Sequence, residues 1–244
     1  MSYKGRDVEV VQINNKESLV IACDSCGGIG FKERDVVKAS PYIVGETTTR
    51  VALMELVAVG AVPKSMSLTI ASEPYPTGEE LIRGAKEELE AFGYKNLPLT
   101  ISTEKNIPTC QTALGITLIG LCNNDSLRIC TAKPEDLVYC LGIPLVGSEV
   151  LSIPASELIT PEDIKALSSL EGINDIIPIG SKGIMGEIEL LCKNINCSFV
   201  NEADTFIDMQ KSAGPSTCII FTASKEVDME SLRLQPVKIG KLAL

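Results

Sequence analysis

The sequence contains no histidine among its 244 residues. Catalytic pairs in which histidine activates serine or cysteine are therefore excluded, and so are zinc sites with histidine ligands. Any proton transfer must use Asp, Glu, Lys, Tyr, Cys or water. No apolar run reaches the roughly 18 residues that a helix needs to span a bilayer, so the sequence predicts no membrane partner.

Positive charge is scarce relative to negative charge. The chain carries 22 Lys and Arg against 32 Asp and Glu, a net charge of −10. This balance argues against a nucleic-acid partner, because affinity for nucleic acid comes largely from basic side chains that neutralise phosphates. A small phosphorylated ligand is not excluded, since such ligands often arrive with Mg²⁺, which carboxylates hold well. The composition, 45% hydrophobic and 22% charged, is typical of a globular protein.

The nine cysteines form no complete metal or disulfide pattern. Their number is odd, no secretory signal is present, and most lie in apolar runs, so we expect buried free thiols and a cytoplasmic location. Cys23 and Cys26 form the only CxxC pair. The alternative is that this pair is redox-active or forms half of a zinc site, with help from Cys192 and Cys197.

Hydrophobic periodicity predicts a chain of mixed α and β structure. We expect helices over 45–63, 77–93, 160–172 and 182–194, and strands over 17–25, 64–72, 97–103, 110–122, 136–142, 173–180, 216–224 and 235–242, the last at a sheet edge. Thr77 and Glu80 have the spacing of a capping box. Turn residues over 122–133 predict a domain boundary there, giving domains 1–125 and 126–244, with a break near 145–160 as the alternative.

Asp24 follows an apolar strand and precedes a glycine-rich turn that contains Gly27, Gly28 and Gly30. In one interpretation Asp24 holds a cation while the glycine amides approach phosphate oxygens. In the other it is an acidic residue in an ordinary turn, since Asp and Gly are both common turn residues. The spacing alone leaves both interpretations open.

Glu55 is surrounded by apolar residues on its predicted helix. A charge on such a surface is costly unless it is paired or bound to metal. We therefore favour a ligand-linked role for Glu55, with an ion pair to a basic residue such as Arg50 as the alternative. Glu46 and Arg50 have i,i+4 spacing, which is typical of a simple ion pair on a helix.

The polar segment 102–106 stands at the end of a predicted strand. In a functional interpretation, Glu104 binds a metal, Lys105 binds a phosphate as a point charge, and Thr103 or Asn106 contacts the ligand. In the ordinary interpretation the segment is a solvated strand end. A second polar cluster, Gly180 to Gly183, lies where a strand leads into a helix, and helix N-termini bind anions. A third lies over 210–217. Neither cluster fits the G-x-x-x-x-G-K-[ST] pattern of a P-loop.

The order of these segments resembles the ATP-binding superfamily of aminoimidazole ribonucleotide synthetase. The motifs are "DSCGG", "VGETTTRVALMELVAVGAVP", "STEKNIPT", "ALGITLIG" and "PIGSKGI", and the resemblance extends over roughly residues 10–225. The superfamily includes thiamin-monophosphate kinase, selenophosphate synthetase and a hydrogenase maturation protein. Within it, the chain is most similar to the short α-ribazole kinase-like branch.

The resemblance implies an α+β fold of two domains, with mixed or antiparallel sheets flanked by helices. It also implies a homodimer in which the N-terminal sheets close a barrel across the interface, which would pair exposed strand edges. ATP would lie in a cleft, with Mg²⁺ held by Asp24, Glu55 and Glu104. Asp24, Lys105 and Lys182 would take part in catalysis. The nucleotide would contact Gly27, Gly28, Thr103, Asn106, Gly180, Ser181 and Gly183.

One departure from the family pattern concerns the segment around Lys182. Thiamin-monophosphate kinase-like members carry a D-x-S-D-G pattern there, and this chain has Ile179 and Lys182 in place of the two aspartates. A metal carboxylate is thus lost and a cation is gained. Either Lys182 neutralises phosphate directly, or this segment binds no metal and recognises a different substrate.

Phosphoryl transfer depends mainly on positioning and charge neutralisation, so the lack of histidine is no obstacle to it. The leading hypothesis is a Mg²⁺-ATP-dependent kinase that phosphorylates a nucleoside-like hydroxyl, with α-ribazole of cobalamin biosynthesis as the candidate substrate. Lys105 and Lys182 would offset negative charge, and Glu46 would orient the hydroxyl. The alternatives are an amide-activating synthetase of the same superfamily, a non-catalytic nucleotide-binding dimer, and a thiol-redox protein built on Cys23 and Cys26.

Overall fold

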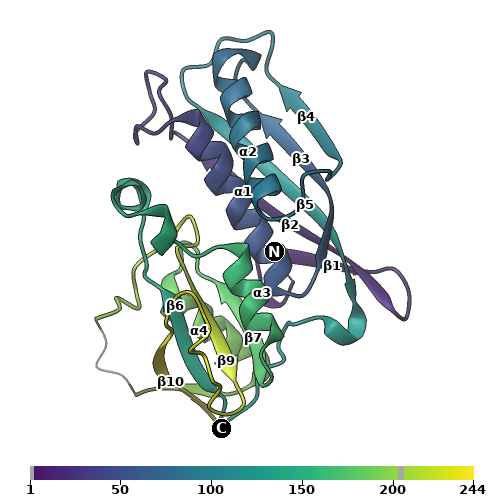
Figure 1. The fold of residues 1–244 in the computed structure, drawn as a ribbon, viewed down its shortest axis with the longest axis vertical. Coiled ribbons are helices and arrows are strands. Elements are labelled where there is room, and N and C mark those ends of the chain that lie inside the picture. The colour runs from purple at the N-terminus through teal and green to yellow at the C-terminus, as the bar shows by residue number, and fades with distance from the viewer. Residues whose placement is uncertain (1–2, 203–205) are drawn as a thin grey trace. The chain divides into compact units, whose positions relative to one another are not determined.

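The computed structural model describes residues 3–202 and 206–244. These residues form two compact units (Figure 1). The N-terminal unit comprises Val8–Leu56 and Ala61–Asn124. The C-terminal unit comprises Asp125–Leu244, Val57–Gly60 and the described part of Met1–Asp7. In the described ranges, no helix combines the length and the apolar composition that crossing a membrane requires.

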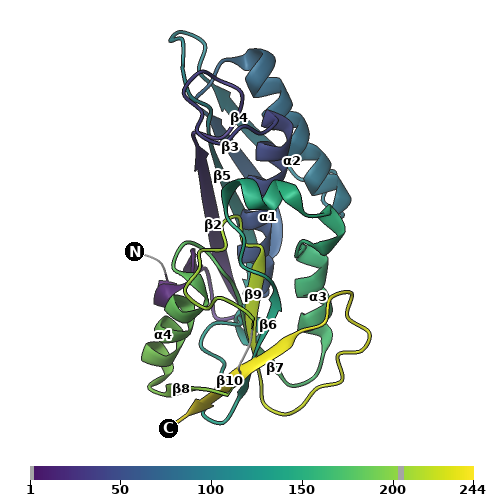
Figure 2. The same cartoon turned by 90° about the vertical axis from the view of Figure 1, so that its left-hand side faces the viewer.

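The N-terminal unit contains a five-stranded sheet of strand order β1-β2-β5-β3-β4. Strands β3 and β4 are parallel, and the other neighbours are antiparallel. Every second residue of β5 is buried, as expected for a strand with one face in a core. Helices α1 and α2 lie on the same face of the sheet (Figure 2). The element bounds are β1 Val8–Gln12, β2 Glu17–Gly27, α1 Pro41–Ala58, β3 Val62–Ile70, α2 Glu79–Ala91, β4 Leu99–Thr103 and β5 Ala113–Asn123.

Two glycines allow α1 and α2 to pack closely. A Cβ atom on Gly45 would lie 2.1 Å from the carbonyl oxygen of Leu81, and one on Gly84 would lie 2.0 Å from that of Tyr42. Real Cβ atoms do not approach backbone oxygens so closely, so any side chain at either position would push the helices apart. The helix contact therefore requires glycine at these two positions.

A buried ion pair joins the same two helices. The guanidinium of Arg50 donates to Glu88 on α2 at 2.5 Å and to Glu46, one turn earlier on α1, at 3.0 Å. The predicted i,i+4 pair of Glu46 and Arg50 is thus confirmed. Arg50 is also shared with a carboxylate 38 residues away, which local spacing does not reveal.

The predicted capping box of Thr77 and Glu80 is wrong. Helix α2 begins at Glu79 after the short helical turn η2 (Pro74–Gly78), and its N-terminus has no side-chain cap. The hydroxyl of Thr77 instead donates to Glu73 at 2.5 Å, and Glu80 pairs with Arg83 at 2.6 Å. The hydroxyl of Thr77 is turned towards Glu73, and it accepts no hydrogen bond from an amide at the start of α2.

The C-terminal unit contains a five-stranded antiparallel sheet of order β7-β9-β6-β10-β8. Residues on both faces of β9 are buried, because α4 packs on one face of the sheet and α3 lies on the other (Figures 1 and 2). The bounds are β6 Leu137–Gly142, α3 Pro161–Ser169, β7 Ile173–Pro178, α4 Gly183–Ile195, β8 Ser198–Asn201, β9 Cys218–Ala223 and β10 Val237–Ala243.

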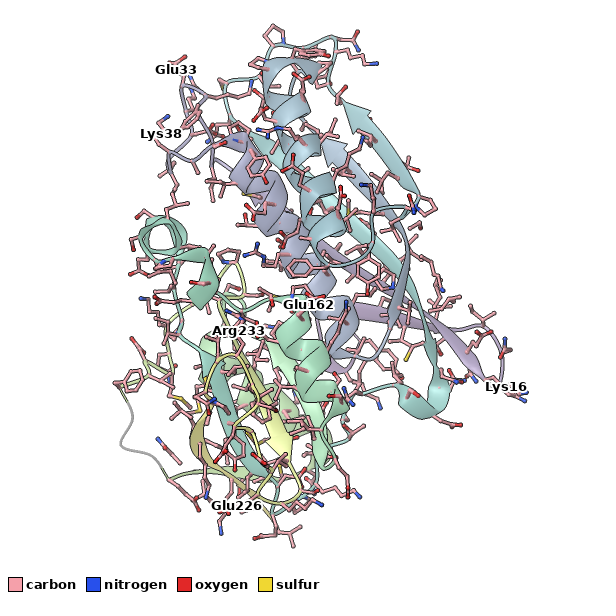
Figure 3. The ribbon with its side chains drawn as sticks, viewed as in Figure 1. Lys16, Glu33, Lys38, Glu162, Glu226 and Arg233 are labelled. Carbon is pink, nitrogen blue, oxygen red and sulfur yellow. The ribbon has the colours of Figure 1, made fainter. Side chains whose placement is uncertain are left out.

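The predicted start of α3 is confirmed. Thr160 and Asp163 form a capping box, in which the hydroxyl of Thr160 donates to Asp163 at 2.9 Å. Arg233, labelled in Figure 3, donates to the same carboxylate at 2.6 Å and so fixes the start of the helix. The predicted edge position of 235–242 is wrong, because β10 pairs with β6 on one side and with β8 on the other.

All nine cysteines are free thiols, and their burial differs from the expectation. Cys122, Cys140, Cys192 and Cys218 are buried as predicted, whereas Cys23 and Cys110 are exposed. Cys23 and Cys26 lie three positions apart in β2, and successive side chains of a strand alternate between faces. The two thiols therefore point to opposite faces of the sheet, which contradicts the redox-pair and half-zinc-site alternatives.

The predicted fold class is confirmed: two sheets, one mixed and one antiparallel, are each flanked by helices. Closure of the N-terminal sheet into a barrel across a dimer stays a prediction.

Candidate functional site

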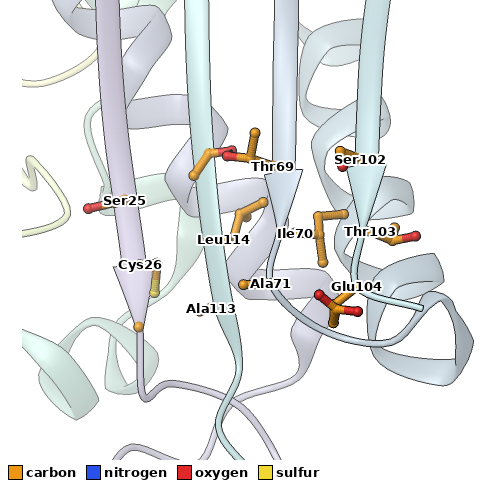
Figure 4. Close-up of a pocket in the computed structure, with 12 residues that line it drawn as sticks. Ser25, Cys26, Thr69, Ile70, Ala71, Ser102, Thr103, Glu104, Ala113 and Leu114 are labelled. Atoms are coloured by element: carbon orange, nitrogen blue, oxygen red, sulfur yellow. The ribbon is translucent and has the colours of Figure 1, made fainter. Parts of the chain in front are cut away.

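A depression of about 600 Å³ opens where four strands of the N-terminal sheet end or begin (Figure 4). Because β2 and β3 are both antiparallel to β5, and β4 is parallel to β3, the carboxyl ends of β2, β3 and β4 emerge at one edge. We call this depression the strand-end pocket. It is lined by Ser25, Cys26, Gly27, Thr69, Ile70, Ala71, Ser102, Thr103, Glu104, Ala113, Leu114 and Gly115.

The pocket lining consists mostly of small residues and mixes polar with apolar groups. Four hydroxyl groups and one thiol contribute to it, and Glu104 is its one charged residue. Such a lining can donate hydrogen bonds to anionic oxygens and can place one carboxylate beside them. Of the predicted site residues, the structure thus brings Gly27, Thr103 and Glu104 together in one pocket.

Glu104 is held firmly at the pocket rim. Its backbone amide donates to the carbonyls of Ile70 and Ser72, which ties the end of β4 to the end of β3. Its Oε1 atom accepts hydrogen bonds from the amides of Asn106 at 2.7 Å and Ile107 at 3.1 Å. These amides lower the pKa of the Glu104 carboxyl. The carboxylate is therefore ionised and oriented at neutral pH.

Lys105 and Asn106 are exposed and do not line the strand-end pocket. The backbone amide of Asn106 is used to orient Glu104. Their predicted contacts with phosphate and nucleotide stay predictions.

The glycine-rich turn is folded back onto the start of β5. The amide of Gly28 donates to the carbonyl of Thr112 at 2.9 Å. A Cβ atom on Gly30 would lie 2.3 Å from Oγ1 of Thr112 and 2.5 Å from Oδ2 of Asp35. Gly27, by contrast, faces open space and lines the pocket. In this structure Gly28 and Gly30 have a clear role in loop packing, and only Gly27 borders the pocket.

Asp35 anchors the loop that follows the glycines. Its carboxylate accepts hydrogen bonds from the amide and the hydroxyl of Thr112, both at 2.8 Å, and from the amide of Lys32 at 2.8 Å. Burial acts to raise the pKa of Asp35, but the hydrogen bonds from Thr112 and Lys32 outweigh burial and lower it. The loop is thus fastened by an ionised carboxylate that sequence reasoning did not single out.

A second interaction that sequence reasoning missed joins three loops around the pocket. The ammonium of Lys32 pairs with Glu73 and donates to the carbonyl of Thr109 at 3.1 Å. Thr77 donates to Glu73 at 2.5 Å, and Thr109 does so at 3.4 Å. We call these four residues the loop latch. The loops that it joins continue from β2, from β3 and from β4.

The charge state of the latch follows from these contacts. Burial acts to raise the pKa of Glu73, but hydrogen bonds from Lys32 and Thr77 prevail and lower it to about 2. No local pattern in the sequence points to this pair, because its members are 41 residues apart.

Ala22, Asp24 and Cys26 are every second residue of β2, so their side chains point to the same face of the sheet. Ala22 is buried, so this is the face that the helices cover. Burial raises the pKa of the Cys26 thiol to about 11; the charge of Asp24 adds to this rise, and a hydrogen bond with Thr48 opposes it. Asp24 thus lies near Cys26, opposite α1. Glu55, also on α1, is 5% exposed.

The three predicted metal ligands do not form a preformed cluster. Neither Asp24 nor Glu55 lines the strand-end pocket, whereas Glu104 does. Within residues 3–202 and 206–244, no three acidic or cysteine side chains gather in an arrangement that could hold a metal ion. The convergence of Asp24, Glu55 and Glu104 on a metal stays a prediction.

The remaining predicted residues belong to the C-terminal unit. Gly183, at φ +71°, lies under the carbonyls of Gln210 and Lys211, and a Cβ atom there would approach them to 2.8 and 2.9 Å. The amide of Met185 donates to the carbonyl of Met209 at 2.9 Å. The loop over 208–211 therefore covers part of the N-terminus of α4.

The neighbouring residues of this turn are more open. Gly180 is partly buried and accepts a hydrogen bond from Ala213 at 3.1 Å, while Ser181 and Lys182 are exposed. The ammonium of Lys182 donates to Glu187 at 3.2 Å. Contact of these residues with a nucleotide or a substrate stays a prediction.

A family model described as "AIR synthase related protein, N-terminal domain" matches residues 5–122. A comparison with curated proteins gave no match.

Solved structures with the same fold include two kinds of protein. PurL of T. maritima, complexed with AMPPCP, aligns with a TM-score of 0.68 and 12% identity over 100% of this chain. Thiamine monophosphate kinase from Aquifex aeolicus aligns with a TM-score of 0.69 and 15% identity over 98% of this chain. A structure of AaThiL complexed with AMPPCP and TMP gives 0.67 and 16% over 98%.

The chain spans 38% of the PurL chain, and 89% and 85% of the other two. Residues 5–122 thus match the model of the AIR synthase related N-terminal domain, and the whole chain has the same fold as these PurL and thiamine monophosphate kinase structures, as the resemblance of its motifs predicts.

Proposed function

We propose that the protein is an ATP-dependent enzyme that phosphorylates a hydroxyl group of a small nucleoside-like molecule, with α-ribazole as the first candidate. The observation that carries the proposal is the strand-end pocket, a depression with four hydroxyl groups and one oriented carboxylate, in a fold shared with structures complexed with AMPPCP. Hydroxyl groups and small residues at strand ends suit a ligand rich in anionic oxygens.

The carboxylates of the N-terminal unit fit a magnesium ion by their chemistry. Asp24, Glu55 and Glu104 offer the hard oxygen ligands that Mg²⁺ takes, and backbone amides keep Glu104 ionised. In this proposal these three residues hold the ion, which supplies charge neutralisation at the phosphates when bound. Gly27 and Thr103 border the nucleotide, and Lys105 and Lys182 bind phosphate oxygens.

A synthetase is the second candidate, because the PurL structures have the same fold. The test is ATP turnover with a panel of nucleosides, including α-ribazole, followed by mass spectrometry of the products. A stable phosphorylated substrate supports the kinase. Free phosphate with a new C–N bond supports the synthetase instead, and saturable ATP binding without turnover on any substrate contradicts both.

We also propose that the protein forms a homodimer through the N-terminal sheet. The face of this sheet that α1 and α2 leave uncovered carries a row of apolar side chains across four strands. The register pairs Val11 with Leu19, Leu19 with Leu121, and Leu121 with Val62. Val11 is 48% exposed and Val62 is 52% exposed. A second copy on this face would remove that apolar surface from water.

A further inference from the structure

Lys182 and Glu187 form an ion pair of unequal burial in the C-terminal unit. The side chain of Lys182 is 44% exposed, whereas that of Glu187 is 6% exposed. The pair Lys225–Glu171 has the same nitrogen–oxygen distance, 3.2 Å, but both of its members lie on the surface. In the Lys182 pair, the anion is fixed in the protein interior and the cation reaches solvent.

A glycine in the first turn of α4 makes room for the lysine. A Cβ atom on Gly186 would lie 2.7 Å from Cβ of Lys182, close to the backbone, where a lysine side chain cannot easily give way. Glycine inside a helix costs about 1 kcal/mol relative to alanine. At position 186 the cost is offset, because glycine leaves the space through which the side chain of Lys182 extends to Glu187.

The carboxylate of Glu187 is held by its buried surroundings. Burial raises the pKa of Glu187, and the charge and hydrogen bond of Lys182 oppose the rise. With smaller effects, the charge of Asp7 raises this pKa and the charge of Arg6 lowers it. Arg6 is itself buried, and its guanidinium donates to the carbonyl of Ile176 at 2.5 Å. Arg6 and Glu187 also line one small cavity of about 10 Å³. Glu187 therefore has little freedom to follow a mobile lysine.

We propose that Glu187 is a positioning residue that holds the ammonium of Lys182 where it binds an anionic oxygen of a phosphorylated ligand. The proposal rests on the proposed function for the nature of the ligand. It assigns Gly186 the role of keeping the lysine path open, and it gives Lys182 a fixed orientation that a surface lysine does not have. Lys182 touches the ligand, and Glu187 acts through Lys182.

The test uses inorganic pyrophosphate as the probe and the full-length chain. Lysine amines are labelled with ¹³C-methyl groups, and the Lys182 signal is identified by its loss in Lys182→Met. Pyrophosphate is titrated into the unsubstituted protein and into Glu187→Gln and Gly186→Ala. Glu171→Gln is the matched control, because it removes a Lys–Glu pair of the same length from the surface of the same unit.

We expect pyrophosphate to shift the Lys182 signal in the unsubstituted protein. In Glu187→Gln and Gly186→Ala, pyrophosphate should bind about tenfold more weakly, because one charge-assisted contact is lost. The control should bind it as the unsubstituted protein does. Thermal unfolding of each variant provides the second readout: a variant that stays folded at the temperature of the titration while it loses affinity has lost the anion contact and not the fold. Equal affinity for pyrophosphate in all proteins would overturn the positioning role of Glu187. A Lys182 signal that does not shift on addition of pyrophosphate would overturn the contact between Lys182 and the anion. ATP turnover of the unsubstituted protein, measured separately, decides the proposed function.

Discussion

The ammonium of Lys32 pairs with the carboxylate of Glu73 and thereby joins the loop after β2 to the segment after β3. The same ammonium reaches the carbonyl of Thr109, so the loop after β4 is included. The three strand ends that line the pocket are thus followed by loops that share one cation. Rigid loops at a strand-end site hold their neighbours in place, which a positioned binding site requires.

The substitution Glu73→Gln should lower stability at neutral pH and lose its effect in acid. The folded-state pKa of Glu73 is about 2, below its ordinary value of 4.5, so its contribution is present above about 4.5 and disappears as the pH falls towards 2. The side chain is 34% exposed, so we expect a difference below about 1 kcal/mol. Urea unfolding of both proteins between pH 7 and pH 2.5 measures it. A difference that stays constant over this range would contradict the assignment.

The substitution Glu88→Ala should destabilise the protein by about 3 kcal/mol or more, because it leaves the guanidinium of Arg50 buried beside one remaining carboxylate. Glu80→Gln, which breaks an exposed pair with Arg83 on the same helix, is the control and should leave stability nearly unchanged. Chemical denaturation at neutral pH compares the two. Similar effects from both substitutions would show that the buried pair does not stabilise the helix contact.

The substitutions Gly45→Ala and Gly84→Ala should each destabilise the N-terminal unit by about 1–3 kcal/mol, because the new methyl group would meet a backbone oxygen of the other helix. Helix propensity acts in the opposite direction by about 1 kcal/mol, so a net loss identifies the steric effect. Thermal unfolding measures it. A gain in stability in either variant would mean that α1 and α2 do not approach as closely as described.

The substitution Asp24→Asn should reduce ATP turnover by orders of magnitude and leave the fold intact, because the proposed function assigns Asp24 to the metal. A second readout does not depend on activity. The charge of Asp24 helps to raise the pKa of Cys26, so the thiol should become more reactive towards an alkylating reagent at pH 8 in the variant. Asp125→Asn, at an exposed position, is the control. Full activity in Asp24→Asn would remove this residue from the proposed metal site.

The double substitution of Val11 and Val62 by lysine should convert a dimer into a monomer, because it places two charges in the apolar row of the uncovered sheet face. Sedimentation velocity measures the change. Glu33→Lys, at an exposed loop position outside the sheet, serves as a control, because it changes the net charge by the same two units. A protein that sediments as a monomer without any substitution would refute the proposed homodimer.

The sequence predicted strong local patterns well and long-range pairing poorly. Alternation and helical spacing located the strands that line the pocket, and the polar residues 102–104 lie where the strand end was expected. The four-residue strand β8 was missed, since so short a run carries little periodicity, and without it β10 was taken for an edge. Which strands become neighbours depends on tertiary packing, which local spacing does not encode.

In the candidate site, too, residues placed by local sequence were predicted and residues placed by distant partners were not. Glu104 and Gly27 follow from local sequence, because each stands directly at a strand end. Lys32, Asp35 and Glu73 were missed, since their partners are distant in the chain. The capping box at Thr77 failed for the same reason: a competing carboxylate outside the helix decided the hydrogen bond.

The central position of β5 has a consequence for biosynthesis. β5 is the last strand of the N-terminal sheet to be synthesised, yet it lies between β2 and β3 and pairs with both. While the ribosome is still making residues before 113, β2 and β3 each keep one unpaired edge in the nascent chain. The sheet closes only by insertion of this late strand, so the interval before it emerges is when the nascent protein is most exposed to wrong pairing with other chains.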